Sequence, residues 1–123
     1  MKKQISLFFV MACIIVIGCR HNHHNTSITF NENDHYYSMK AWFSTNRARD
    51  VEYFMDERIG SQSDMSFVNT RLNGQLSFND HTSFYIKKYP GYLQIKLNKD
   101  RNSDNSYLLI RDMCQGIKSL LAK

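Results

Sequence analysis

Three histidines near the amino terminus form the most metal-like group in this 123-residue sequence. His21, His23 and His24 lie in the polar stretch 20–27, and imidazole nitrogens bind copper, nickel and zinc. No cysteine or carboxylate of that stretch completes the closed ligand shell of a structural zinc site. The stretch therefore predicts a solvated linker, with metal binding as the alternative, and the sequence indicates no other cofactor.

Cys114 and two further histidines are the remaining groups that could take part in catalysis. Cys114 falls on the apolar stripe of a helical segment, where a buried, unreactive thiol is expected. His35 and His81 each follow a turn aspartate. No phosphate-binding loop, nucleophile elbow or paired-cysteine motif is present. We predict no catalytic residues and no enzyme activity, with a small hydrolase or metal-binding protein using these histidines as the alternative.

Aromatic and basic residues that alternate along several strand-like segments indicate a binding surface. In segment 35–43, Tyr36, Lys40 and Trp42 point one way because strand side chains alternate. Tyr, Trp and Arg are enriched among interface hot spots, so this face could hold an acidic protein surface, a glycan or a peptide. The alternative is that these aromatic residues only favour strand packing. The candidate partner-binding residues are Tyr36, Lys40, Trp42, Arg71, Tyr85, Lys87, Tyr92 and Lys96.

The periodicity of the chain predicts five strands and two helices. Gly60 is expected to end the first helix in a left-handed conformation. The acidic residues of that helix are expected to form a solvated face. Gly74 predicts a bulge or a close neighbour within a strand, and Gly116 a close contact of the last helix. The expected order is strand, strand, helix, strand, strand, strand, helix over residues 28–30, 35–43, 44–60, 71–78, 83–88, 92–97 and 103–121.

Every predicted strand has one apolar face, which favours a sheet covered on one side only. We therefore predict an α+β fold, a two-layer sandwich of a five-stranded mixed sheet with two helices on one face. The helix between the second and third strands predicts a right-handed crossover between parallel strands. In that arrangement the turns at 33–34 and 90–91 share one end of the sheet, and the turn at 79–80, with His81, lies at the other end, far from His35.

The first nineteen residues have the pattern of an export signal. Lys2 and Lys3 precede an apolar run over 5–17, which is too short to cross a bilayer as a helix. The run ends in Val16-Ile17-Gly18-Cys19, which resembles the lipobox of bacterial lipoproteins. The usual lipobox has Leu, a small residue, Gly or Ala, then Cys, so Ile17 departs from the pattern.

The lipobox resemblance implies an address and a domain layout. It implies cleavage before Cys19, leaving residues 1–18 as the signal peptide, and acylation of Cys19, for example with palmitate. Residues 19–27 would then be a lipidated tether and 28–123 one small α+β domain. Arg20 follows the cysteine where many inner-membrane lipoproteins have Asp, so the resemblance favours the periplasmic face of the outer membrane. Cys114 is left without a disulfide partner.

These observations lead to one preferred function and one rival. Without Lys2 and Lys3 the chain has 14 basic and 11 acidic residues, and this net charge of +3 gives only a weak preference for anionic partners. Nucleic acid is not expected in the periplasm. We predict a lipid-anchored periplasmic binding or accessory module, attached to the membrane and with a protein or glycan partner in the envelope. The rival is an immunity or inhibitor lipoprotein directed against a secreted toxin or enzyme.

Overall fold

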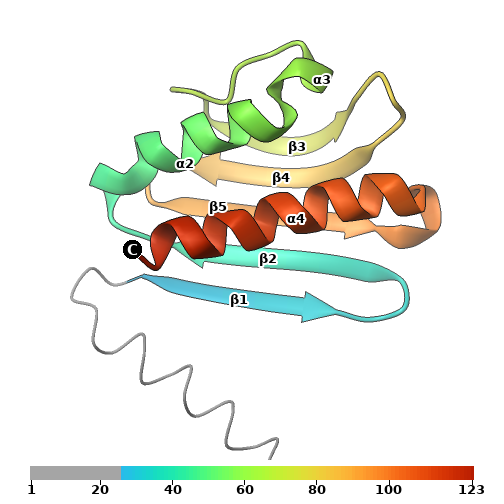
Figure 1. Ribbon diagram of the computed structural model, residues 1–123, viewed down its shortest axis with the longest axis horizontal. Coiled ribbons are helices and arrows are strands. Elements are labelled where there is room, and N and C mark those ends of the chain that lie inside the picture. The colour runs from blue at the N-terminus through green and yellow to red at the C-terminus, as the bar shows by residue number, and fades with distance from the viewer. Residues whose placement is uncertain (1–25) are drawn as a thin grey trace, which may run out of the picture.

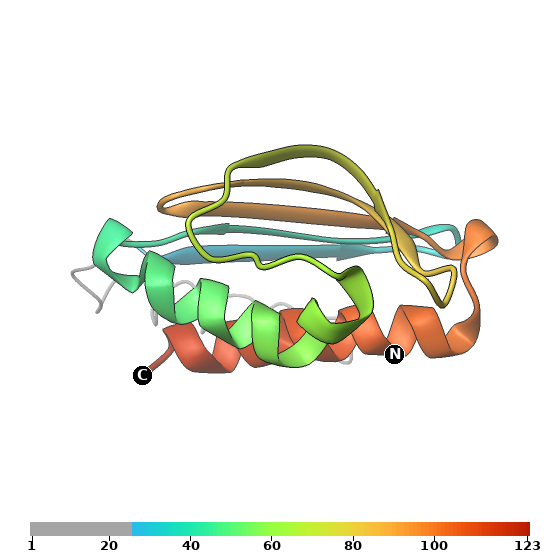
Figure 2. The same cartoon turned by 90° about the horizontal axis from the view of Figure 1, so that it is seen from above.

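The computed structural model describes residues 26–123. The predicted lipidation site Cys19 and the candidate metal ligands His21, His23 and His24 lie outside the described residues. The described residues form an α+β domain in which helices cover one face of a five-stranded sheet and leave the other face open, as Figure 2 shows from above. The predicted α+β class and the predicted order of strands and helices are confirmed.

The strands follow the alternation of apolar and polar residues. Along β2, for example, Tyr37, Met39 and Ala41 are buried while Tyr36, Lys40 and Trp42 are exposed. In the sheet the strands have the order β1-β2-β5-β4-β3 (Figure 1). Their bounds are β1 Ser27–Glu32, β2 Tyr36–Trp42, β3 Leu72–Ser77, β4 Ser83–Tyr89 and β5 Tyr92–Asn98.

Two helical segments make up the second layer. The first begins with a 3₁₀ turn, Thr45–Arg47, and runs through α2 (Ala48–Met55) and a π-helical stretch, Asp56–Gly60, into α3 (Ser61–Ser63). A 3₁₀ turn, Lys99–Arg101, precedes α4 (Asp104–Leu121). As expected for a helix cap, the Ser103 hydroxyl accepts a hydrogen bond from the backbone N–H of Ser106 at 3.1 Å.

The prediction of a mixed sheet is wrong, because all four strand pairings are antiparallel. The first helical segment carries the chain from β2 to the far edge of the sheet, and β4 and β5 then fill the space between as hairpin-linked neighbours. No parallel crossover forms. The turns at 33–34 and 79–80 therefore share one end of the sheet, and the turn at 90–91 lies at the other. His35 and His81 consequently lie at the same end, contrary to expectation.

Three glycines test the local predictions. Gly60 is helical, with φ of −62°, and the left-handed residue that ends the segment is Asp64, with φ of 58°; the helix continues past Gly60. Gly74 pairs regularly with Ile86, and a Cβ there would meet nothing within 4 Å, so the predicted bulge or close neighbour is absent. A Cβ on Gly116 would lie 2.3 Å from Cζ of Phe54, which confirms the predicted close contact.

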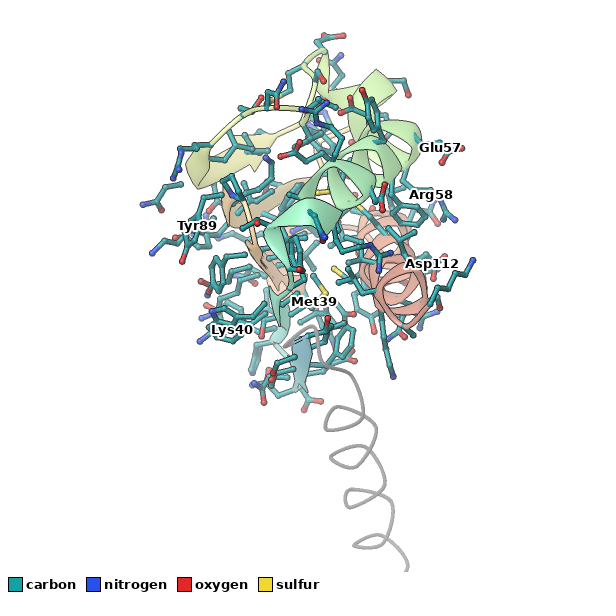
Figure 3. The ribbon with its side chains drawn as sticks, turned by 90° about the vertical axis from the view of Figure 1, so that its left-hand side faces the viewer. Met39, Lys40, Glu57, Arg58, Tyr89 and Asp112 are labelled. Atoms are coloured by element: carbon teal, nitrogen blue, oxygen red, sulfur yellow. The ribbon has the colours of Figure 1, made fainter. Side chains whose placement is uncertain are left out.

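The hydrophobic core lies between the sheet and the helices. Figure 3 shows Met39 in this layer, whereas Lys40 and Tyr89 point away from the helices. Cys114 is fully buried, as predicted, and burial raises the pKa of its thiol far above the usual range. The fully buried apolar residues include Met39, Ala41, Met55, Ile59, Phe67, Phe84, Ile86, Leu93, Ile95, Leu97, Ile110, Met113, Cys114 and Ile117.

Candidate functional site

The open face of the sheet carries side chains in rows that cross the strands. Antiparallel register aligns Trp42 with Tyr92 and Tyr92 with Tyr89, and we call these three residues the aromatic row. The next row places Gln94 between Lys40 and Lys87. A third row contains Ser38, Lys96, Tyr85 and Gln75. Beyond it, at the end of the two strands, Tyr36 of β2 pairs with Asn98 of β5.

The aromatic row is packed tightly. The Tyr89 and Tyr92 rings stack with centroids 5.1 Å apart and an interplanar angle of 22°, and Trp42 lies 5.0 Å from Tyr92. Trp42 is 44% exposed and Tyr89 38%, whereas Tyr92 is 7% exposed. Burial is the largest cause of a raised pKa of Tyr92, and its neutral hydroxyl donates to Oε1 of Gln94 at 3.0 Å. The row is therefore a rigid apolar platform with two accessible rings.

Lys40, Lys87 and Lys96 form a cluster around Gln94, which we call the lysine triad. Strand spacing of about 4.8 Å and a rise of about 3.3 Å per residue place their Cα atoms roughly 8–10 Å apart. In the part of the chain that the structure describes, no triad ammonium forms an ion pair with a carboxylate. The Lys96 ammonium instead lies 4.6 Å from the centroid of the Tyr36 ring. These charges are available to an incoming anion.

Negative charge is segregated from this face. The sequence has eleven acidic residues, all within the described range, and none occupies an outward position of a strand. Glu57 and Asp112 lie on the helical side in Figure 3, opposite Lys40. Glu32 is in phase with the inward Phe30, and its Oε2 accepts from Lys99 Nζ at 2.7 Å and from the Tyr107 hydroxyl at 2.5 Å. The open face thus carries the lysine triad and the adjacent Arg71 without a balancing carboxylate.

Two hollows flank the Tyr36–Lys96 pair. The larger has a volume of about 450 Å³ and includes Tyr85 and Arg101 in its wall, and the smaller has about 220 Å³. Glu32 contributes to the wall of the smaller hollow, but its carboxylate is engaged by Lys99 and Tyr107. The open face therefore carries aromatic rings and ammonium groups with two recesses between them.

All eight residues predicted for partner binding lie along this face. Seven belong to its strands, and Arg71 directly precedes β3, with its guanidinium 5.9 Å from the Tyr89 ring centroid. Their role in binding stays a prediction. Tyr89 was missed because the predicted strand ends at residue 88, which leaves Tyr89 in the turn before residue 92. Continuing the alternation of Tyr85 and Lys87 by two residues would have identified it.

A buried ion pair on the other side of the sheet was not foreseen. Lys88 Nζ lies 2.8 Å from Glu52 Oε2, and the side chains are 3% and 8% exposed. Lys88 also donates to the carbonyl oxygen of Thr70, and Glu52 Oε1 accepts from the N–H of Asn69 at 3.0 Å. The prediction that the acidic residues of the first helix form a solvated face is wrong for Glu52. Lys88 is in phase with Phe84 and Ile86, which was the signal for its burial.

Asp56 makes a second set of contacts from the same helical segment. Its Oδ1 accepts from the N–H of Phe67, and its Oδ2 accepts from the Ser66 hydroxyl at 2.7 Å. With Glu52, this carboxylate fastens the loop over residues 64–71 to the helix. The acidic residues of this segment therefore organise a loop in addition to contacting solvent.

The groups considered for catalysis do not assemble into a site within residues 26–123. His35 Nδ1 lies 2.9 Å from Asp100 Oδ2, with both side chains exposed. His81 is exposed in a left-handed turn position, with φ of 70°. Over this range no group of three His, Cys, Asp or Glu residues is arranged to hold a metal ion. None of the helices in this range has the length and apolar character needed to cross a membrane.

The chain matches no known family model, no curated protein sequence and no solved structure.

Proposed function

We propose that this protein is a lipid-anchored binding module of the bacterial envelope whose open sheet face holds an acidic partner protein. The observation that carries the proposal is the charge segregation: the face has the lysine triad and Arg71, and none of the eleven acidic residues has an outward position on a strand. Glu32 borders the smaller hollow, but its carboxylate is engaged by Lys99 and Tyr107. A surface of one sign attracts a partner of the opposite sign and rejects like-charged ones.

The aromatic row supplies the large, closely packed side chains that a protein-binding surface needs. Interfaces owe most of their binding energy to a few large side chains, often Tyr, Trp and Arg, that are held rigidly. Trp42 and Tyr89 present such rings on either side of the buried Tyr92. In the proposed complex these rings form the apolar centre of the contact, and the lysine triad pairs with carboxylates around it.

The address follows from the lipobox resemblance of Val16-Ile17-Gly18-Cys19. Acyl chains on Cys19 would each contribute about 0.8 kcal/mol per buried methylene, so two or three chains make attachment effectively permanent. The proposed location is the periplasmic face of the outer membrane. There the partner is another envelope protein or a secreted protein that enters the periplasm.

Capture of partners from an envelope extract tests the proposal. We expect Trp42→Ala with Tyr85→Ala, and separately Lys40→Glu with Lys96→Glu, to lose an acidic protein that the unaltered chain captures. Arg58→Glu is the matched control, because Arg58 is exposed on the helical side (Figure 3). Capture should also weaken as salt is raised, since salt screens exposed charges. An unchanged partner list in both open-face variants would overturn the proposal.

A further inference from the structure

A recess separate from the lysine triad lies where the start of α2 approaches the β4–β5 turn. It has a volume of about 500 Å³, and its wall includes Asn46, Arg49, Asn69, Thr70 and Arg71, with Glu52 among the lining residues. This volume lies within the range of about 300–1,000 Å³ that is common for small-molecule sites, and the recess is open to solvent on one side. Its polar groups distinguish it from an apolar groove, and we call it the arginine pocket.

Two guanidinium groups give the pocket its charge. Arg49 Nη2 donates to the side-chain oxygen of Asn69 at 3.3 Å, and Arg71 borders the Tyr89 ring. Within residues 26–123 neither guanidinium forms an ion pair with a carboxylate. Arg47, by contrast, is paired with Asp50 at 3.2 Å and also donates to the carbonyl oxygen of Leu120. Arg49 and Arg71 therefore keep donors for a ligand.

The one carboxylate in the pocket wall does not cancel this charge. Glu52 is buried, and its two oxygens are occupied by the Lys88 ammonium and the Asn69 N–H. The Glu52–Lys88 pair is thus neutral as a unit and holds Asn69 and Thr70 in place. A buried ion pair of this kind contributes little net stability, so its value here is in fixing the wall of the pocket.

We propose that the arginine pocket binds a small polar ligand that carries a carboxylate or phosphate group, of the size of a sugar acid or a sugar phosphate. Arg49 and Arg71 clamp the oxyanion, because guanidinium donors match the planar fork of a carboxylate and the oxygens of a phosphate. The amide of Asn46 and the hydroxyl of Thr45, both exposed, bind ligand hydroxyl groups. The pocket is distinct from the proposed protein-binding face and meets it only at Arg71.

Titration of the ¹⁵N-labelled full chain with glucuronate, glucose 6-phosphate and glucose tests this proposal by NMR. We expect saturable shifts at the backbone amides of 45–49 and 69–71 with at least one of the two anions, and none with glucose. The two anions distinguish a carboxylate from a phosphate ligand. Arg49→Gln and Arg71→Gln should each weaken binding about tenfold or more, because each removes charge-assisted hydrogen bonds.

Arg58→Gln is the control and should bind the anion with unchanged affinity, since Arg58 is exposed on the helical side. Arg49 is exposed, so Arg49→Gln should keep the unfolding midpoint of the unaltered chain. Three results would overturn the proposal: no saturation by either anion in the millimolar range, equal affinity in Arg49→Gln, or shifts centred on the lysine triad. If Arg49→Gln loses anion binding but still captures the partner protein, the arginine pocket acts independently of the proposed protein-binding face.

Discussion

Replacing Lys88 by methionine removes one half of the ion pair buried between β4 and α2. The change leaves the Glu52 carboxylate with the Asn69 N–H as its remaining partner and leaves the carbonyl oxygen of Thr70 without the Lys88 donor. Breaking a buried pair in this way costs about 3–5 kcal/mol. Since domains of this size are stable by about 5–15 kcal/mol, the variant should lose a large part of its free energy of unfolding.

A double-mutant cycle shows whether the cost comes from the lone charge. Glu52→Gln should also destabilise, although the glutamine oxygen can still accept from Asn69. The double variant Lys88→Met with Glu52→Gln should cost less than the sum of the single changes by about 2–3 kcal/mol, because it buries no unpaired charge.

Urea unfolding at pH 7, followed by circular dichroism and by the fluorescence of Trp42, the single tryptophan, measures these values. Lys87→Met is the matched control: Lys87 is the adjacent residue but lies on the open face, so its loss should change stability by less than about 0.5 kcal/mol. A Lys88→Met variant that unfolded within about 1 kcal/mol of Lys87→Met, at an unchanged m-value, would show that the buried pair is not needed for stability.

Gly116→Ala should destabilise the fold by about 1–3 kcal/mol, less any gain in helix propensity, because the new Cβ would clash with the Phe54 ring. Gly74→Ala should be tolerated, because a Cβ there meets nothing within 4 Å. Thermal unfolding of the two variants measures the difference. Hydrogen bonds from Lys99 and Tyr107 lower the pKa of Glu32, so its ionised form stabilises the folded state at pH 7. Glu32→Gln should therefore lower the free energy of unfolding at pH 7 by less than about 1 kcal/mol, because the group is partly exposed. The difference in urea midpoint between the variant and the unaltered chain should vanish as the pH falls below the pKa of Glu32. Mass spectrometry should find acyl chains on Cys19, and Cys19→Ser should leave the membrane fraction.

Strand alternation explains why the open face could be predicted from the sequence. A period of two assigns each residue of a strand to a face without knowledge of its neighbours, and Trp42, Tyr85 and Lys96 fall on the open face as predicted. The same rule does not say which strands pair. The alternation along β5 is compatible with several positions in the sheet. Its position between β2 and β4 is therefore known only from the three-dimensional structure.

The buried pair and the arginine pocket were missed for different reasons. Lys88 was in phase with the apolar positions of β4, but a lysine is expected in solvent unless a buried partner is known. That partner, Glu52, lies 36 residues away along the chain. Arg49 and Arg71 border one recess only because the loop over 64–71 is fastened to α2. The contacts that hold this loop against α2 depend on tertiary structure and leave no periodic signal in the sequence.

The pairing of Ser27 with Trp42 has a consequence for how a partner can approach. It puts the point where the chain enters the sheet beside the aromatic row, at the β4–β5 turn end. With Cys19 lipidated as proposed, the eight residues from there to Ser27 reach at most about 29 Å when fully extended. A tether of this length would keep the aromatic end of the sheet close to the bilayer, so partners anchored in the same leaflet would be favoured over distant ones.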